Sequence, residues 1–280
     1  MLALAGVFVF LALEGYPGLS VAESFYRPAT TFLGYVGPLV FGTTLAAVLA
    51  LIISVPFAIG IALFISHYAP ARIATPVAYV MDLLAAVPSV VYGLWGGGVL
   101  AANIRPVQEW LHDTLAFLPF FAGPPSATGR TMLTAGLVLA IMILPITTAI
   151  CREVFAQTPR LNEEAALALG ATRWELVRMA VFPYARSGMV SAVMLGLGRA
   201  LGETMAVAMV LSASPVVTLN LISSDNPATI ASNIAVNYKE ASPDKQAVLI
   251  ATGLVLFAFT FAVNFLARYI AGRSDRRMAR

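Results

Sequence analysis

The sequence predicts an all-α integral membrane protein with about six transmembrane helices. Hydrophobic residues make up 59% of its 280 residues and charged residues only 11%, whereas soluble domains carry about 25% charged residues. The apolar residues also gather in runs long enough for helices of roughly 20 residues, the length that crosses a bilayer. Together these two observations place the chain in a membrane.

Composition excludes several classes of site. The single cysteine, Cys151, rules out an internal disulfide and a multi-cysteine metal site. His67 and His112 are too few for a histidine-built metal or catalytic centre, so we expect no metal and no catalytic residue. Neither of the only lysines, Lys239 and Lys245, follows a glycine, as a phosphate-binding P-loop requires. If ATP drives this protein, another chain must bind the ATP and its Mg²⁺.

The first 36 residues are assigned to a first span and an outer loop. The apolar run 2–13 has no preceding basic residues and no clear small-residue cleavage site, which argues against a signal peptide. Because the run is short for a span, we expect it to extend past Glu14 or to begin upstream of Met1.

Residues 37–270 are expected to form one membrane domain of five further spans. Pro56 is expected to kink the first of these. A short helix opened by Asn226 and Pro227 is expected in the last outer loop, and residues 271–280 form a basic tail. The predicted spans are 37–66, 73–102, 131–150, 187–213 and 247–270.

The basic residues predict the orientation, since cytoplasmic loops carry an excess of arginine and lysine. One side of the predicted topology holds Arg27, Arg105, Arg130, Lys239 and Lys245. The other side holds Arg72, Arg152, Arg160, Arg173, Arg178, Arg186, Arg268, Arg273, Arg276, Arg277 and Arg280. The larger set places the loop after the fourth span, both termini and the basic tail in the cytoplasm. Because the basic residues cluster beside the spans, the net charge of +3 does not indicate nucleic-acid binding.

A polar island, EEAALALGATRWELVRMAVFP at 163–183, separates two long apolar stretches. Lipid gives such an island nothing to pack against. Its alanines, Ala165 and Ala166, would let a partner approach closely, and Gly170 permits a turn between two short helices. Pro183 is suited to begin the next long helix. The alternative is an ordinary amphipathic loop between two spans.

The spacing of this island resembles the cytoplasmic EAA coupling loop of bacterial ABC importer permeases. The resemblance implies the ABC type I importer permease fold, with a coupling loop at 158–183 that docks on a separate ATPase. Ala180 and Phe182 stand where that family usually has Ile and Leu, which leaves the docking details open. The docking positions that the resemblance implies are Glu163, Glu164, Ala165, Ala166, Gly170 and Pro183.

Two charged residues, Arg199 and Glu203, lie mid-way along the predicted fifth span. Four residues apart, they would project from one face of a helix. Each costs about 2.5–3.5 kcal/mol at a span centre, whereas a helical pair at this spacing returns only about 0.2–0.5 kcal/mol. We therefore expect them to face a wet cavity or a partner chain, the alternative being a structural ion pair. Gly198 and Gly202 beside them form a step that permits close helix packing.

Asp82, in the predicted third span, has two interpretations of equal weight. It could line a pathway with Arg199 and Glu203, or it could snorkel or form an ion pair near the membrane surface.

A longer resemblance narrows the family. The run PYARSGMVSAVMLGLGRALGETMAV at 183–207 and the PSVVYG at 88–93 are similar to the phosphate-specific ABC importer permeases of the PstC type. This implies a multi-pass subunit of the bacterial inner membrane that forms half of a phosphate pathway, with Arg199 and Glu203 at the charged positions of the translocation helix. The implied partners are a related PstA-type permease, a dimer of ATP-binding subunits and an extracytoplasmic phosphate-binding protein.

Other functions stay open on the residues alone. An arginine fork suits any oxyanion, so sulfate, molybdate or tungstate are alternatives to phosphate. A proton-driven secondary carrier would use Glu203 and Asp82 as a relay, but no inverted repeat is visible. A membrane scaffold would leave Arg199 unexplained.

Overall fold

The computed structural model describes residues 2–278, with side chains for residues 2–269. The side chains of the predicted basic tail at 271–280 lie outside the described part. Within that part, five helices are long and apolar enough to cross a membrane, and a sixth crossing results if Ala71–Ala86 and Ser89–Asn103 are one broken span. This agrees with the prediction of about six transmembrane helices.

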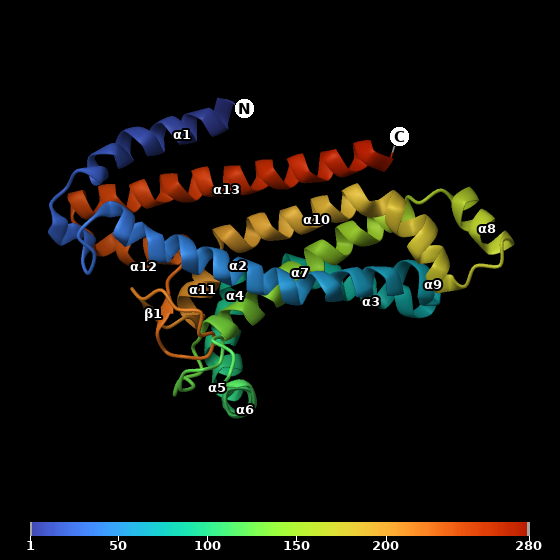
Figure 1. Cartoon of the computed structure of the whole chain (residues 1–280), viewed down its shortest axis with the longest axis horizontal. Helices are drawn as coiled ribbons and strands as arrows, with labels where there is room; N and C mark the ends of the chain where they lie inside the picture. The colour runs from blue at the N-terminus through green and yellow to red at the C-terminus, as the bar shows by residue number, and fades with distance from the viewer. Residues whose placement is uncertain (1, 279–280) are drawn as a thin grey trace. The chain divides into compact units, whose positions relative to one another are not determined.

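The chain is helical almost throughout, with short 3₁₀ and π segments joined to the α-helices (Figure 1). In chain order the elements are α1 (Leu2–Gly15), η1 (Tyr16–Leu19), η2 (Glu23–Tyr26), α2 (Phe32–Leu63), η3 (Phe64–Tyr68), α3 (Ala71–Ala86), α4 (Ser89–Trp95), η4 (Gly96–Leu100), α5 (Ala101–Asn103), α6 (Arg105–Leu115), α7 (Met132–Ala156), α8 (Arg160–Ala168), α9 (Arg173–Leu176), η5 (Val177–Val181), α10 (Phe182–Gly202), α11 (Met205–Val210), β1 (Ala213–Ser214), β2 (Asn226–Pro227), α12 (Ile230–Asn237), η6 (Tyr238–Glu240) and α13 (Pro243–Met278).

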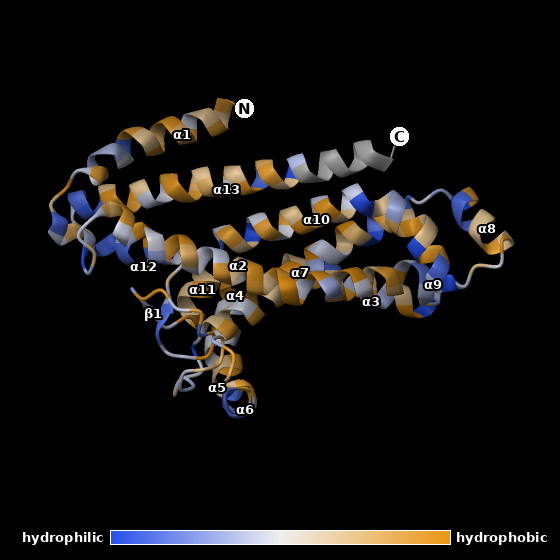
Figure 2. Ribbon diagram, in the orientation of Figure 1, coloured by the Kyte–Doolittle hydropathy of each residue, from blue (hydrophilic) through white to orange (hydrophobic). Residues whose placement is uncertain are grey.

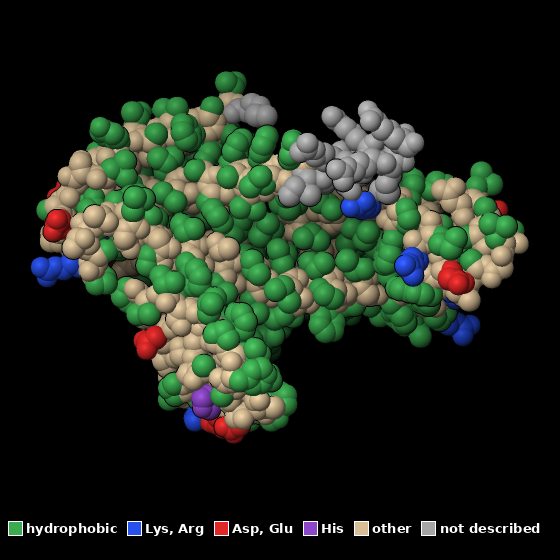
Figure 3. Space-filling model, viewed as in Figure 1, with side chains coloured by type: hydrophobic (Ala, Val, Ile, Leu, Met, Phe, Trp, Pro, Cys, Tyr) green, Lys and Arg blue, Asp and Glu red, His purple; other side chains and the backbone are tan. Residues whose placement is uncertain are grey.

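Three predicted spans appear as continuous helices that extend beyond the apolar runs from which they were predicted. The second runs through α2 into η3, the fourth is α7 and the sixth is α13. Figure 2 colours these helices largely as hydrophobic, with polar residues gathering near α6 and α9. On the face drawn in Figure 3, hydrophobic side chains cover the helices and charged ones are sparse. Such a surface suits lipid, where a helix satisfies its own backbone hydrogen bonds.

The predicted third span, 73–102, is not one helix. α3 ends at Ala86, and Val87 and Pro88 are extended, with ψ of 129° and 142°. Proline disfavours the helical conformation of the residue before it, so Pro88 accounts for the break. The segment predicted as one span is therefore broken at this point, with an angle of 94° between its two halves.

The chain folds as two compact units that each gather three stretches of sequence. Unit 1 comprises residues 1–50, 88–139 and 200–263, and unit 2 comprises residues 51–87, 140–199 and 264–280.

In unit 1, α4 and η4 pack against α11 through glycines. A Cβ built on Gly93 would lie 2.9 Å from Ala206 Cα, and one on Gly97 would lie 2.7 Å from the Met209 carbonyl oxygen. No side chain fits at these distances, so the glycines let the two backbones meet directly, as small residues do in membrane helix pairs. This packing fixes the position of α11.

The segments of unit 1 outside the predicted spans differ from their prediction in two places. Asn226 and Pro227 do not open a helix; they form β2, which pairs in parallel with β1. The short helix is present as α12, where the Thr229 side chain accepts from the Ser232 N–H and so caps the N-terminus. Helix α6 lies in the stretch 103–130, between two predicted spans, where the apolar pattern predicts no helix.

In unit 2, a buried apolar cluster joins the ends of α2, α7 and α10 to the short helices α8 and α9. Phe155 of α7 belongs to this cluster and is fully buried. The other buried members are Ala62, Leu63, Cys151, Ala166, Leu176, Val177, Val181, Ala185 and Ala192. The short helices are therefore anchored on the spans through their own apolar residues.

Candidate functional site

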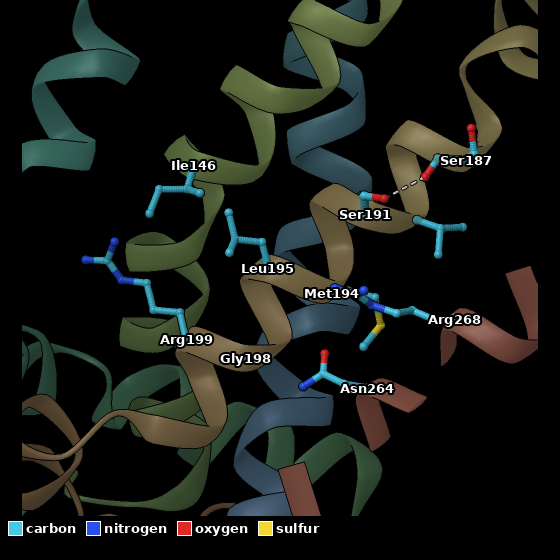
Figure 4. A pocket seen from close by; sticks show the side chains of 10 residues that line it. Ile146, Ser187, Ser191, Met194, Leu195, Gly198, Arg199, Asn264 and Arg268 are labelled. Carbon is cyan, nitrogen blue, oxygen red and sulfur yellow. Dashed lines mark hydrogen bonds between the residues drawn. The ribbon is translucent and has the colours of Figure 1, made fainter. Parts of the chain in front are cut away.

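A cavity of about 680 Å³ lies beside α10 within unit 2 (Figure 4). One wall is α10 itself, and the others come from Ile146 of α7 and from Asn264 and Arg268 of α13. The residues of α10 that line it are Ser187, Val190, Ser191, Met194, Leu195, Gly198 and Arg199.

The sequence of α10 makes room for this cavity. Ser187, Ser191 and Gly198 are separated by four and seven residues, so they share one stripe of the helix. All three are exposed, and the Ser191 hydroxyl donates to the Ser187 carbonyl oxygen at 3.0 Å. Small side chains along the stripe leave the space that longer ones would fill.

Gly198 and Gly202 do not form a packing seam within the described part of this chain. A Cβ on either glycine would meet nothing within 4 Å. The step that predicted close helix packing thus faces open space in the isolated chain. Contact with another chain at these glycines stays a prediction.

The cavity carries positive charge. Arg199 and Arg268 line it, and none of its lining residues is acidic. Arg199 is half-buried, and among the described side chains it has no ion-pair partner. An anion that entered this space would find a planar donor fork suited to an oxyanion and no carboxylate to repel it.

The two arginines are not aimed at one point. In Figure 4 the Arg199 side chain leaves α10 on the side away from α13, whereas Arg268 extends from α13 towards Met194. Sequence reasoning missed the contributions of Asn264 and Arg268. The signal for Asn264 was available, because a polar residue inside an apolar span tends to face a cavity or another helix.

The prediction that Arg199 and Glu203 share one helical face was wrong. Helix α10 ends at Gly202, and Glu203 and Thr204 are not helical. The Glu203 carboxylate accepts a hydrogen bond from the Ala206 N–H at 3.1 Å and is only 8% exposed. It therefore satisfies one of the free N–H groups at the start of α11. Glycine costs about 1 kcal/mol in a helix relative to alanine, which favours the break at Gly202.

Asp82 forms an ion pair in place of lining the cavity beside Arg199. Its Oδ1 lies 3.7 Å from Arg152 Nη2, and its side chain is 53% exposed. Asp82 does line a separate cavity of about 340 Å³ in unit 2. Of the two interpretations, pairing is the one that the structure favours. An exposed pair of this kind contributes about 0–1 kcal/mol.

The polar island folds as two short helices joined by a tight turn. Gly170 has φ of +84°, a conformation that glycine adopts without strain, and a Cβ there would meet nothing within 4 Å. The next helix, α9, begins with a capping box between Thr172 and Glu175. The turn therefore presents Gly170 on an open surface.

Five of the six docking positions, all but Pro183, separate into an anchored and an exposed set. Ala166 is buried in the apolar cluster of unit 2, and Glu163 Oε1 lies 3.6 Å from His67 Nε2. Both attach α8 to its own chain, which corrects the prediction that Ala166 lies against a partner. Glu164, Ala165 and Gly170 are exposed.

Large apolar side chains surround the exposed set. Leu161, Leu167 and Leu169 are 77%, 51% and 86% exposed. An exposed apolar surface of this kind marks a place where another protein or a membrane is in contact.

Pro183 does not begin a new helix. The chain is helical without a gap from Arg173 to Gly202, and Pro183 is the second residue of α10. A proline inside a helix clashes with the carbonyl group four residues before it. The π-helical segment η5, immediately before α10, widens the turns there and accommodates the ring.

Comparison with known proteins gives consistent results. Residues 54–278 match the family described as binding-protein-dependent transport system inner membrane component. The chain is 46% identical over 284 residues to phosphate transport system permease protein PstC 2 of Mycobacterium tuberculosis, covering 97% of this chain and 87% of the relative. It is 48% identical over 233 residues to phosphate transport system permease protein PstC of Mycobacterium leprae, covering 82% and 73%.

Solved structures share the fold. A bacterial ABC transporter involved in the import of the acidic polysaccharide alginate matches with a TM-score of 0.62 at 14% identity, covering 90% of this chain and 86% of the other. An inward-facing MetNI methionine ABC transporter matches with a TM-score of 0.54 at 17% identity, covering 84% and 94%. Identity at this level shows a common fold.

Proposed function

The chain belongs to the family of binding-protein-dependent transport system inner membrane components, and from this premise we propose that it is the permease subunit of an ATP-driven phosphate importer. The observation that carries the proposal is the cavity beside α10, where Arg199 is half-buried without an ion-pair partner in the described part and no acidic residue lines the wall. The names of its relatives, phosphate transport system permeases, supply the substrate.

Arg199 contacts the anion as it crosses the membrane. A guanidinium offers two parallel N–H donors that match two oxygens of a phosphate. The exposed stripe of Ser187, Ser191 and Gly198 forms a smooth wall beside it. Half of the pathway comes from this chain, and a related PstA-type permease supplies the other half.

ATP hydrolysis is coupled to transport at the exposed face of α8. A dimer of ATP-binding subunits holds ATP and Mg²⁺ and receives this face, with Glu164, Ala165 and Gly170 at the contact and the leucines of α8 around it. ATP-driven closure of that dimer moves α8. Because Ala166 and Phe155 share the apolar cluster of unit 2, the movement reaches the spans. No residue of this chain catalyses a reaction in this scheme.

The chain sits in the bacterial inner membrane with both termini in the cytoplasm, and an extracytoplasmic phosphate-binding protein delivers the substrate. A proton-driven carrier is less well supported, because both carboxylates of its proposed relay already have structural partners. Glu203 is committed to the Ala206 N–H, and Asp82 is paired with Arg152.

Substrate competition tests the assignment. Cells that express the complete transporter should take up radiolabelled phosphate, and excess unlabelled phosphate should suppress that uptake. Equal concentrations of sulfate, molybdate or tungstate should not. A matched strain that lacks only this chain gives the background. Uptake of sulfate or molybdate in place of phosphate would support the assignment as a permease and contradict phosphate as its substrate.

A further inference from the structure

A second cavity, of about 610 Å³, lies within unit 1. Its wall comes from the segment that joins η2 to α2, from α2, from β1, and from α12 and the start of α13. In the orientation proposed above, all of these lie at the extracytoplasmic side. The cavity contains none of the residues that line the cavity beside Arg199.

The charge of this second cavity is positive. Arg27 and Lys245 line it, and no aspartate or glutamate does. Arg27 is exposed. Within the described part of the chain, neither basic side chain has an ion-pair partner. The two charges are therefore available to an anion that enters.

Lys245 is held in place by its surroundings. Its Nζ donates to the Phe25 carbonyl oxygen at 2.6 Å and lies 4.2 Å from the centroid of the Tyr35 ring. A lysine ammonium has three N–H donors, so one hydrogen bond leaves two for a ligand. A side chain that is already fixed loses less conformational entropy when it binds.

Tyr35 supplies a further donor. Its phenolic oxygen accepts from Asn233 Nδ2 at 2.9 Å. Because the oxygen accepts in that contact, its own O–H is left to donate. The cavity thus gathers ammonium, guanidinium and hydroxyl donors from three separate segments of the chain.

We propose that this cavity binds a phosphate group. Several charged and neutral donors without a carboxylate are the chemistry that recognises a phosphate oxyanion. Two sources share that chemistry: a free phosphate ion and the headgroup of an outer-leaflet phospholipid, whose acyl chains would contact the apolar side chains of Pro28, Pro38 and Leu39. The cavity is concave and lined by five segments, which suits a small group better than the flat surface of a protein.

This inference goes beyond the proposed function. It concerns residues outside the Arg199 cavity, and it holds whether or not the chain imports phosphate.

The test measures phosphate binding to the purified full-length chain in detergent. All variants carry Arg199→Gln, so that the cavity beside α10 binds phosphate less strongly and contributes equally in every variant. Binding of inorganic phosphate is measured by equilibrium dialysis at low salt, and the phospholipids retained by each chain are counted by native mass spectrometry. Arg27→Gln should weaken phosphate binding roughly tenfold or more, or remove one retained phospholipid. Arg27→Lys should fall between, since it keeps the charge and loses the fork.

Lys239→Gln is the matched control, because Lys239 is exposed on η6 and does not line the cavity. Tyr35→Phe keeps the ring below Lys245 and removes only the O–H, so it should weaken the same binding to a smaller extent. If Arg27→Gln weakens the binding of inorganic phosphate, the cavity is a site for the free ion. If it removes only the retained phospholipid, the cavity is a headgroup site. If Arg27→Gln changes neither, or changes both no more than Lys239→Gln does, the cavity is not a phosphate site. Weaker capture of the extracytoplasmic binding protein without either change would likewise overturn the proposal in favour of protein docking.

Discussion

Replacing Arg199 by glutamine is expected to lower phosphate uptake roughly 10- to 150-fold while the transporter assembles at its normal level, because one hydrogen bond to a charged group contributes roughly 1.5–3 kcal/mol. Arg199 has no ion-pair partner among the described side chains. Its removal therefore leaves no described carboxylate buried without a partner. Arg199→Lys should give an intermediate rate, since it keeps the charge and loses the bidentate fork.

The measurement compares complex yield on a native gel with radiolabelled phosphate uptake. Arg105→Gln is the control, since it removes an exposed arginine whose pair with Glu109 is also exposed. If Arg199 were half of a structural ion pair, breaking the pair would destabilise the complex by about 3–5 kcal/mol. Yield and uptake would then fall together, and the proposed substrate contact would be wrong.

Variants of Glu203 form the second arm of this experiment. Glu203→Gln keeps an oxygen that can accept from the Ala206 N–H, so assembly should be preserved even if transport changes. Glu203→Ala removes the acceptor, and losing such a helix-start contact costs about 0.5–2 kcal/mol. Equal yields for Gln and Ala would contradict the capping role of Glu203.

Replacing Gly170 by valine or tryptophan is expected to uncouple the chain from its ATPase. The left-handed conformation costs a residue with a Cβ roughly 1–2 kcal/mol, and a branched side chain tolerates it least. Tryptophan adds bulk at the exposed contact as well. Asparagine tolerates positive φ better than other residues, so Gly170→Asn should retain more function than Gly170→Val.

Co-purification of the ATPase and phosphate uptake are the two readouts. The side chains introduced at Gly170 meet no atom of the described chain within 4 Å at Cβ. A loss of ATPase binding therefore reports the turn or the partner surface and not a clash inside the fold. Normal assembly and uptake with both valine and tryptophan would show that this turn does not couple the two proteins.

The positions of the spans could be predicted from sequence because lipid leaves few alternatives. An apolar run of more than about 20 residues must be helical to satisfy its backbone in the membrane. The second, fourth and sixth spans followed from this rule. Their ends did not, since α13 begins at Pro243 and α2 at Phe32, where polar or mixed residues continue the helix beyond the apolar run.

The breaks inside the spans were harder to predict. Long apolar stretches lie on both sides of the segment Arg199–Thr204, so hydropathy averaged over a span does not register the gap between α10 and α11. The signals were local: Gly202 and Thr204 are weak helix formers, and Pro88 marks the break after α3. The break at Gly202 makes Glu203 a capping group for α11 and removes it from the helical face of Arg199.

The roles within the polar island depended on tertiary packing. Its turn at Gly170 could be predicted from the residue type. Which alanine faces inward could not, because Ala165 and Ala166 differ only in their place relative to the apolar cluster. The pair between His67 and Glu163 joins residues 96 positions apart, so no local sequence pattern predicts it.

ATP-dependent uptake into proteoliposomes tests the central claim most directly. The chain is reconstituted with its partner permease, its ATPase dimer and the binding protein, and radiolabelled phosphate is followed with and without ATP. Uptake should require ATP and the ATPase, and it should persist when an ionophore dissipates the proton gradient. Phosphate uptake by this chain alone, driven by a pH gradient without ATP, would contradict the assignment of this protein as an ABC importer permease.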